Sequence, residues 1–160
     1  MTRLTYTQSN DEHPSWSPDG RRIAFHSGCS LAVIDSDGSN WVTLLEARDD
    51  LCVTFPTWSP DGRHIAFRSR TPPTIPTRQH DIYVVNDDGS GLRKLASFAS
   101  EEWSGYAVWS PKGSRVAFDI ILDGQERYYA VNSNGSGELV EIPSIPDSWY
   151  PWHWPQWVTE

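Results

Sequence analysis

The residues of this chain that are best suited to chemistry are its five histidines. They are His13, His26, His64, His80 and His153. Imidazole nitrogens bind transition metals and exchange protons near neutral pH. No two of these histidines have the spacing by which one helix places two ligands side by side. His13 and His153 would meet only if the two ends of the chain packed together, so we predict no metal site and no cofactor.

The arrangements used for nucleophilic catalysis are missing from the sequence. It has no Gly-x-Ser-x-Gly turn, and it has no glycine-rich phosphate loop. The Ser-Pro and Gly-Ser pairs that it does contain are typical of turns. We therefore predict no catalytic residue.

Acidic and aromatic side chains gather in three connections, and we take them as candidates for binding a partner. Clustered carboxylates focus negative potential, which attracts a cation or a basic peptide. Solvated loops are the more ordinary explanation of such charges, and both explanations remain open. The candidates are Asp11, Glu12, His13, Asp49, Asp50, Glu101, Glu102, Trp103 and Tyr106.

An internal repeat defines the elements that must position these residues. The string Trp-Ser-Pro-Asp-Gly begins at Trp16 and Trp58, and a third copy at Trp109 has Lys112 in place of the aspartate. Each copy is followed by an apolar triplet of the type Ile-Ala-Phe and then by Asp-Gly-Ser or Asn-Gly-Ser. Three marks in a constant order, about 40 to 50 residues apart, indicate a propeller or a solenoid.

Each repeat contains four short strands. In the first repeat we expect strands at 14–17, 22–26, 31–35 and 41–45, because apolar runs alternate there with Pro-Asp-Gly and Asp-Gly turns. The turn aspartates are best explained by turn geometry. Four antiparallel strands in about 40 residues correspond to one propeller blade. We therefore predict an all-β fold of four-stranded propeller blades, with about three and a half blades in the chain.

The predicted boundaries follow the repeat. A proline-rich insert at 68–80 is expected to be a surface loop between two strands of the second blade, with arginines on its rim. The expected segments are the outer strand of a preceding blade at 1–7, blades at 13–48, 55–98 and 106–142, and the start of a fourth blade or a closing segment at 147–160.

The repeat resembles that of the TolB-type β-propeller family, also called the WD40-like or PD40 repeat. The resemblance covers about residues 1–142 and rests on Pro-Ser-Trp-Ser-Pro-Asp-Gly-Arg-Arg-Ile-Ala-Phe at 14–25, on its two companions, and on Asp-Ile-Tyr-Val-Val-Asn at 81–86. It implies a closed ring of six or more blades that binds partner segments at its channel. It also implies a periplasmic location in many members.

About three and a half blades are too few for such a ring, and an open arc would expose apolar faces at both ends. We favour closure by self-association, in a homodimer or a higher oligomer. A small four-bladed ring and a fragment of a longer protein are the alternatives. The residues expected to close the ring are Leu4, Trp149, Trp152, Trp154 and Trp157.

Charge and hydropathy restrict the partners. The formal net charge of −8 argues against a nucleic-acid partner, which needs clustered Lys and Arg. The sequence contains no run of 18 apolar residues, so we predict no membrane insertion. Residues 1–10 do not resemble a secretory signal. The sequence as written therefore predicts a cytoplasmic location, whereas the resemblance to the family implies a periplasmic one. Cys29 and Cys52 could pair across one face, but we favour two free thiols.

The sequence supports two classes of function. The first is a non-enzymatic module that binds a peptide or protein at the loop face or channel mouth. The second is an oligomer-dependent hydrolase or metal-dependent lyase of propeller type, or a fragment of a larger propeller enzyme. We favour the first, the non-enzymatic binding module.

Overall fold

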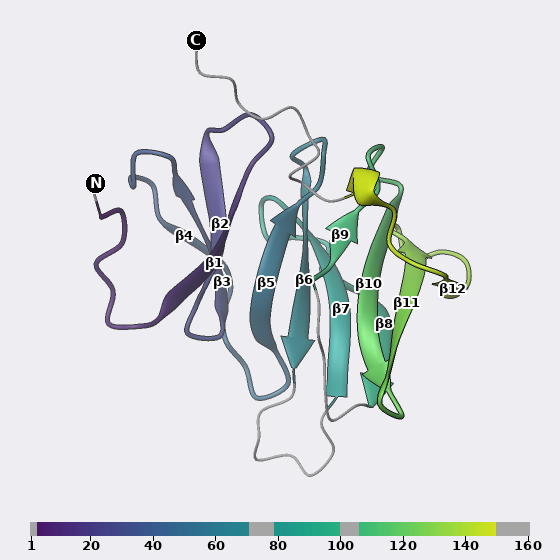
Figure 1. The fold of residues 1–160 in the computed structure, drawn as a ribbon. Helices are drawn as coiled ribbons and strands as arrows, with labels where there is room; N and C mark the ends of the chain where they lie inside the picture. Colours follow the sequence, from purple (N-terminus) through teal and green to yellow (C-terminus); the bar gives the residue numbers. More distant parts are fainter. Residues whose placement is uncertain (1–2, 71–78, 100–105, 150–160) are drawn as a thin grey trace.

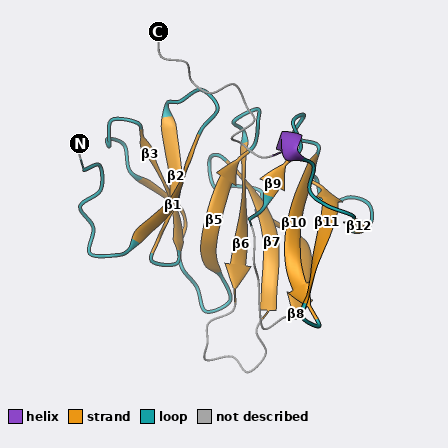
Figure 2. Ribbon diagram, in the orientation of Figure 1, coloured by secondary structure: helices purple, strands orange, loops and turns teal. Residues whose placement is uncertain are grey.

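The computed structural model describes residues 3–70, 79–99 and 106–149. These residues form three antiparallel sheets of four strands each, arranged side by side as three propeller blades (Figures 1 and 2). The predicted all-β propeller architecture is therefore confirmed. Blade 1 comprises β1 (Asp11–Trp16), β2 (Arg22–Ser27), β3 (Ser30–Asp35) and β4 (Val42–Leu45).

The other two blades repeat this order. Blade 2 comprises β5 (Cys52–Trp58), β6 (His64–Arg70), β7 (Gln79–Asn86) and β8 (Arg93–Ala99). Blade 3 comprises β9 (Val108–Trp109), β10 (Arg115–Leu122), β11 (Gln125–Asn132) and β12 (Val140–Ile142). The first strand of each blade lies innermost, because β5 packs against both β1 and β9.

One predicted element differs from the structure. The insert was expected to be a loop over 68–80, but 68–70 and 79–80 continue the β6–β7 hairpin in register, with Arg70 opposite His80. Only 71–78 of the insert lie outside the described residues. Asp147–Trp149 forms a 3-10 turn, closed by a hydrogen bond from the Trp149 N–H to the Pro146 carbonyl. The rest of the segment 147–160, which we expect to start a fourth blade or to close the ring, lies outside the described residues.

The repeated turns have the hydrogen bonds that their sequence predicts. The Ser17 and Ser59 hydroxyls donate to Asp19 and Asp61, at 2.6 Å in both turns. The same carboxylates accept the backbone N–H two residues later. These aspartates therefore form turns, as expected, and the two equivalent turns differ little in geometry.

The blades pack through alternating large and small residues. The Ile-Ala-Phe triplet places its large side chains on one face of the sheet and its alanine on the other, because strand side chains alternate. Ile65 and Phe67 pack against blade 1, whereas Ala66 packs against blade 3. Two layers of the core therefore lie between neighbouring blades, and two further clusters lie on the outer faces of blades 1 and 3.

Both outer faces of the array are partly covered by chain ends. Leu4 packs on the face of blade 1 that points away from blade 2. A Cβ built on Gly38 would lie 3.1 Å from the Leu4 carbonyl oxygen. In the next blade, a Cβ built on Gly89 would lie 2.9 Å from the carbonyl oxygen of Leu44 in β4, so the two contacts are equivalent. Residues 3–7 thus occupy the position of a preceding outer strand, although they hold no strand in the described structure.

At the other end, Ile145 and Trp149 pack on the free face of blade 3. Leu4 and Trp149 therefore lie on opposite ends of the array, each against a terminal blade. Trp152, Trp154 and Trp157, which we also expect to close the ring, lie outside the described residues.

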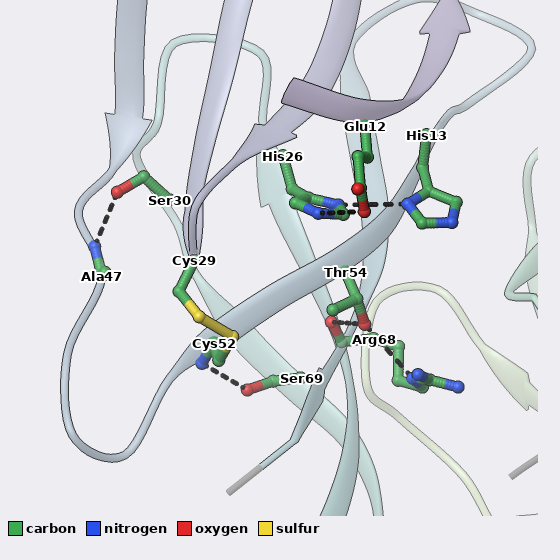
Figure 3. The surroundings of a disulfide bond; sticks show 10 residues. All are labelled: Glu12, His13, His26, Cys29, Ser30, Ala47, Cys52, Thr54, Arg68 and Ser69. Atoms are coloured by element: carbon green, nitrogen blue, oxygen red, sulfur yellow. Dashed lines mark hydrogen bonds and ion pairs between the residues drawn. A yellow bond between two sulfur atoms is a disulfide. The ribbon is translucent and has the colours of Figure 1, made fainter. Parts of the chain in front are cut away.

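A disulfide bond joins blades 1 and 2, so the expectation of two free thiols is wrong. Cys29 stands in the β2–β3 turn and Cys52 begins β5, and their Cα atoms are 4.4 Å apart (Figure 3). The Val53 N–H also donates to the Cys29 carbonyl at 2.9 Å. Sequence separation could not reveal this proximity, because it depends on how the two blades pack.

No helix within the described residues has the length and apolarity needed to cross a membrane.

Candidate functional site

Three aromatic rings form a row along the innermost strands. His13, Phe55 and Tyr106 each stand three residues before the repeated tryptophan, so they occupy one position of the repeat. The ring centroids of His13 and Phe55 are 3.8 Å apart, and those of Phe55 and Tyr106 are 4.9 Å apart, both edge to face. We call these three residues the aromatic row. It runs across all three blades where the inner strands begin.

A bulge in each of the first two inner strands aims these rings. The pairing of β1 with β2 shifts register between Glu12 and Ser15, and that of β5 with β6 shifts between Thr54 and Thr57. His13 and Phe55 have φ angles of 55° and 52°, in the left-handed region that non-glycine residues rarely adopt. Such strain is concentrated at binding sites, and bulges re-aim side chains.

A second row of polar side chains lies beside the first. His26, Arg68 and Asp119 each follow the apolar triplet, so they too occupy one position of the repeat. His26 and Asp119 are each only 6% exposed. Polar residues at this one place in all three blades, buried in blades 1 and 3 and partly buried in blade 2, are unusual for a sheet core, where turn geometry cannot explain them.

Arg68 is the central member of this polar row. Its guanidinium lies 4.8 Å from the centroid of the Phe55 ring, and its Nε donates to the Thr54 hydroxyl at 3.2 Å. Burial and the nearby Arg70 lower the pKa of Arg68 to about 10, and Asp119 opposes the change. The group therefore remains a cation at neutral pH, held against an aromatic face.

In blade 1 the two rows meet in a cluster of three polar side chains. His13 Nδ1 lies 3.3 Å from His26 Nδ1, and His26 Nε2 lies 3.5 Å from a Glu12 carboxylate oxygen. Figure 3 shows these side chains converging from β1 and β2. Burial, and next to it the proximity of His13, lower the pKa of His26, so the buried ring is neutral at pH 7.

The other predicted binding residues are placed less uniformly. Asp11 accepts a hydrogen bond from the Thr7 hydroxyl at 2.7 Å, so it holds the N-terminal segment to β1. Burial opposes ionisation of Asp11, but hydrogen bonds from Ser27 and Thr7 outweigh it and lower the pKa. Asp49 and Asp50 are exposed in the turn between β4 and β5, where Arg48 lies 3.4 Å from Asp50.

Tyr106 is 54% exposed and is the most accessible member of the aromatic row. Glu101, Glu102 and Trp103 lie outside the described residues. Of the nine predicted binding residues, the structure thus brings Glu12, His13 and Tyr106 to the aromatic row or its edge.

Sequence reasoning missed Phe55, His26, Arg68 and Asp119 as members of this site. Aligning the three repeats on their tryptophans would have found them. The position three before the tryptophan is His, Phe or Tyr, and the position after the triplet is His, Arg or Asp. Because the side chains at each of these positions differ in type or charge, the repeated backbone does not require any one of them.

Comparison with known proteins identifies the fold and leaves the activity open. No family model matches the sequence, and no curated protein matches it. Solved structures do match. A putative TolB from Agrobacterium tumefaciens superposes with a TM-score of 0.65 at 21% identity, over 88% of this chain and 48% of that one. TolB from Acinetobacter baumannii gives 0.64 at 17%, over 86% of this chain and 33% of that one.

An enzyme is also similar in structure. An oligogalacturonate lyase in complex with manganese superposes with a TM-score of 0.57 at 22% identity, over 79% of this chain and 35% of that one. At such identities the likeness shows the fold alone. The chain has a TolB-like propeller fold, and it spans between a third and a half of the length of these three structures.

Proposed function

We propose that this chain is a binding module of a TolB-like propeller and that it holds a peptide segment of a partner protein on the aromatic row. The observation that carries the proposal is the row itself, in which three rings at one repeat position lie edge to face across three blades. Two of its members are held in a strained backbone conformation. A fold keeps such strain where the surrounding structure or a function requires it.

The chemistry of the row suits a peptide. Exposed aromatic rings give large contact area at low cost in conformational entropy, and they dominate the energy of many interfaces. The neighbouring charges are mixed, with Glu12 at one end and Arg68 in the middle. We therefore expect a peptide with an aromatic or apolar residue on Tyr106 and polar groups toward Arg68, in place of the purely basic peptide that the acidic connections suggest.

The experiment is affinity selection of random peptides displayed on phage, with the purified chain as bait. We expect peptides to be enriched and to bind Tyr106→Ser at least about tenfold more weakly, as is typical for loss of an interface aromatic. The matched control is His64→Gln, since His64 begins β6 at the opposite edge of the blade, beside the Asp61 turn. Failure to enrich any peptide, or equal binding by Tyr106→Ser, would contradict the proposal.

We further propose that the propeller is completed by strands of a second copy at the open face of blade 1. The support comes from the repeated tryptophans. Trp58 and Trp109 are 4% and 3% exposed, whereas Trp16 is 53% exposed. Trp58 is covered by the preceding blade, where Arg22 lies 4.7 Å from its ring centroid. Trp16 lacks such a cover among the described residues, which favours a docked strand there.

The disulfide supports an oxidising compartment for the module, because such bonds persist mainly in secreted and periplasmic proteins. The alternative function, a hydrolase or metal-dependent lyase of propeller type, stays a hypothesis. It requires a turnover assay, which peptide selection does not replace.

A further inference from the structure

We infer that Glu12, His13 and His26 form a binding site for a divalent transition-metal ion of the zinc type. One ligand atom from each residue lies within 4.8 Å of the others, and within 3–70, 79–99 and 106–149 no other group of three such side chains does so. Two imidazoles and a carboxylate are the ligand types that Zn²⁺ and its first-row neighbours prefer. The inference departs from our expectation from sequence that no metal site exists, and it does not depend on peptide binding.

The distance between the two imidazoles fits an ion. His13 Nδ1 and His26 Nδ1 are 3.3 Å apart. Two nitrogens that are each about 2.0–2.1 Å from a tetrahedral ion lie about 3.4 Å from one another. The Glu12 carboxylate lies 3.5 Å from the other ring nitrogen of His26, Nε2. Because this side chain is 53% exposed, it can move to an ion on the Nδ1 side without unpacking the core.

Blade 2 shows that the blade fold does not need these side chains. At the positions equivalent to Glu12, His13 and His26, blade 2 has Thr54, Phe55 and Arg68. Phe55 reproduces the backbone of His13, with a φ angle of 52° against 55°. Of these two blades only blade 1 combines three ligand-forming side chains, although the positions share one strand and bulge geometry.

The surrounding residues determine the solvent access and the electrostatic potential of the proposed site. His26 is buried at 6% exposure, which fixes its ring, while Glu12 keeps the site open to solvent. Three protein ligands leave at least one position for water or for an anionic group, as in reactive rather than structural zinc sites. Arg70 contributes positive charge near His26, which weakens cation binding, and Asp11 and Glu12 oppose it.

The test is titration of the untagged full chain with Zn²⁺ by calorimetry and with Co²⁺ by visible absorption. We expect one ion per chain and, for Co²⁺, the intense bands of a four- or five-coordinate centre. The variants His13→Phe and Glu12→Thr install the residues of blade 2, so we expect them to fold. Each should weaken binding more than about tenfold.

His64→Gln is the control that should bind like the wild type, and circular dichroism checks that every variant is folded. Arg70→Gln should bind more tightly, because a nearby positive charge is removed. The inference is overturned if the wild type binds no ion stoichiometrically, which would leave a simple hydrogen bond between the two histidines. It is equally overturned if His13→Phe and Glu12→Thr bind as tightly as the wild type.

Discussion

At the scale of single residues, one blade serves as a control for another. Asp61 accepts hydrogen bonds from the Ser59 hydroxyl and the Arg63 N–H, whereas Lys112 stands at the same turn position of blade 3. We expect Asp61→Ala to lower the free energy of unfolding by about 1 kcal/mol, since two hydrogen bonds to a largely exposed carboxylate are lost. Thermal unfolding measures the change, and Lys112→Ala should leave the midpoint nearly unaltered.

Acid titration gives Asp61 a second test. Burial alone would raise its pKa, but the hydrogen bonds from Ser59 and Arg63 outweigh it, so the folded state has a lowered pKa. A carboxylate with a lowered pKa contributes stability above its unfolded value of 3.8, and this stability is lost as the pH falls through the folded value. The stabilities of wild type and Asp61→Ala should therefore converge in strong acid, and a constant difference would contradict the assignment.

His26 becomes positively charged only when it is protonated, so its effect on stability appears at a higher pH than that of Asp61. Burial and His13 lower its pKa, and Arg70 adds to the effect, while Glu12 and Asp11 oppose it. Because the folded protein resists protonation of this ring, stability should fall as the pH drops below the ordinary value of 6.5. Urea unfolding in the presence of a chelator, at about pH 7.5 and pH 5.5, should show a larger loss for the wild type than for His26→Asn. Equal losses would assign the acid sensitivity to another group.

At the scale of elements, the glycine of each Asp-Gly-Ser or Asn-Gly-Ser turn faces the preceding outer strand or, for Gly38, the segment 3–7 that takes its place. A Cβ on Gly89 would lie 2.9 Å from the Leu44 carbonyl, whereas a Cβ on Gly124 would meet no atom within 4 Å. The φ angles are similar, at 84° and 73°, so both alanine variants bear the cost of a left-handed residue, about 1–2 kcal/mol. Gly89→Ala must also separate β4 from the turn. Chemical denaturation should therefore find it clearly less stable than Gly124→Ala, and equal stabilities would argue against this contact.

The sequence predicted the strands and turns better than it predicted the contacts between blades. The Trp-Ser-Pro-Asp-Gly and Asp-Gly-Ser strings determine local turns, so the twelve strands of the three blades follow from them. The Cys29–Cys52 bond and the contact between His13 and Phe55 join different blades. Their formation depends on the packing angle between sheets, which no single repeat encodes. The bulges at His13 and Phe55 were likewise missed, because a register shift leaves little trace in an alternating pattern.

The disulfide gives a prediction about how blades 1 and 2 are held together. It closes a loop between residues 23 positions apart. A bond over such a loop stabilises by about 3 kcal/mol, mainly by restricting the unfolded chain. We expect Cys29→Ser with Cys52→Ser to lower the thermal midpoint, and dithiothreitol to do the same to the wild type alone. Two reactive thiols in the native wild-type chain, found by thiol titration without reductant, would contradict the bond.

At the scale of the whole molecule, the two ends of the array differ. The free face of blade 3 is covered by Ile145 and Trp149, whereas on blade 1 Leu4 covers the outer part and Trp16 remains exposed. The uncovered part lies where the inner strands of a preceding blade would pack, since Trp58 and Trp109 are buried there by blades 1 and 2. An open edge with an exposed tryptophan favours association with further strands.

Self-association therefore makes a prediction that separates it from peptide binding. Light scattering over a concentration series should give about twice the chain mass of 18.1 kDa, or a higher multiple, for the wild type. Trp16→Ser should shift the mass toward the monomer with little loss of fold, because the side chain is already half exposed. Tyr106→Ser should keep the wild-type mass, since Tyr106 belongs to the aromatic row. A wild type that stays monomeric at all concentrations would contradict a second copy as the source of the missing strands, and it would leave the rest of a longer polypeptide as that source.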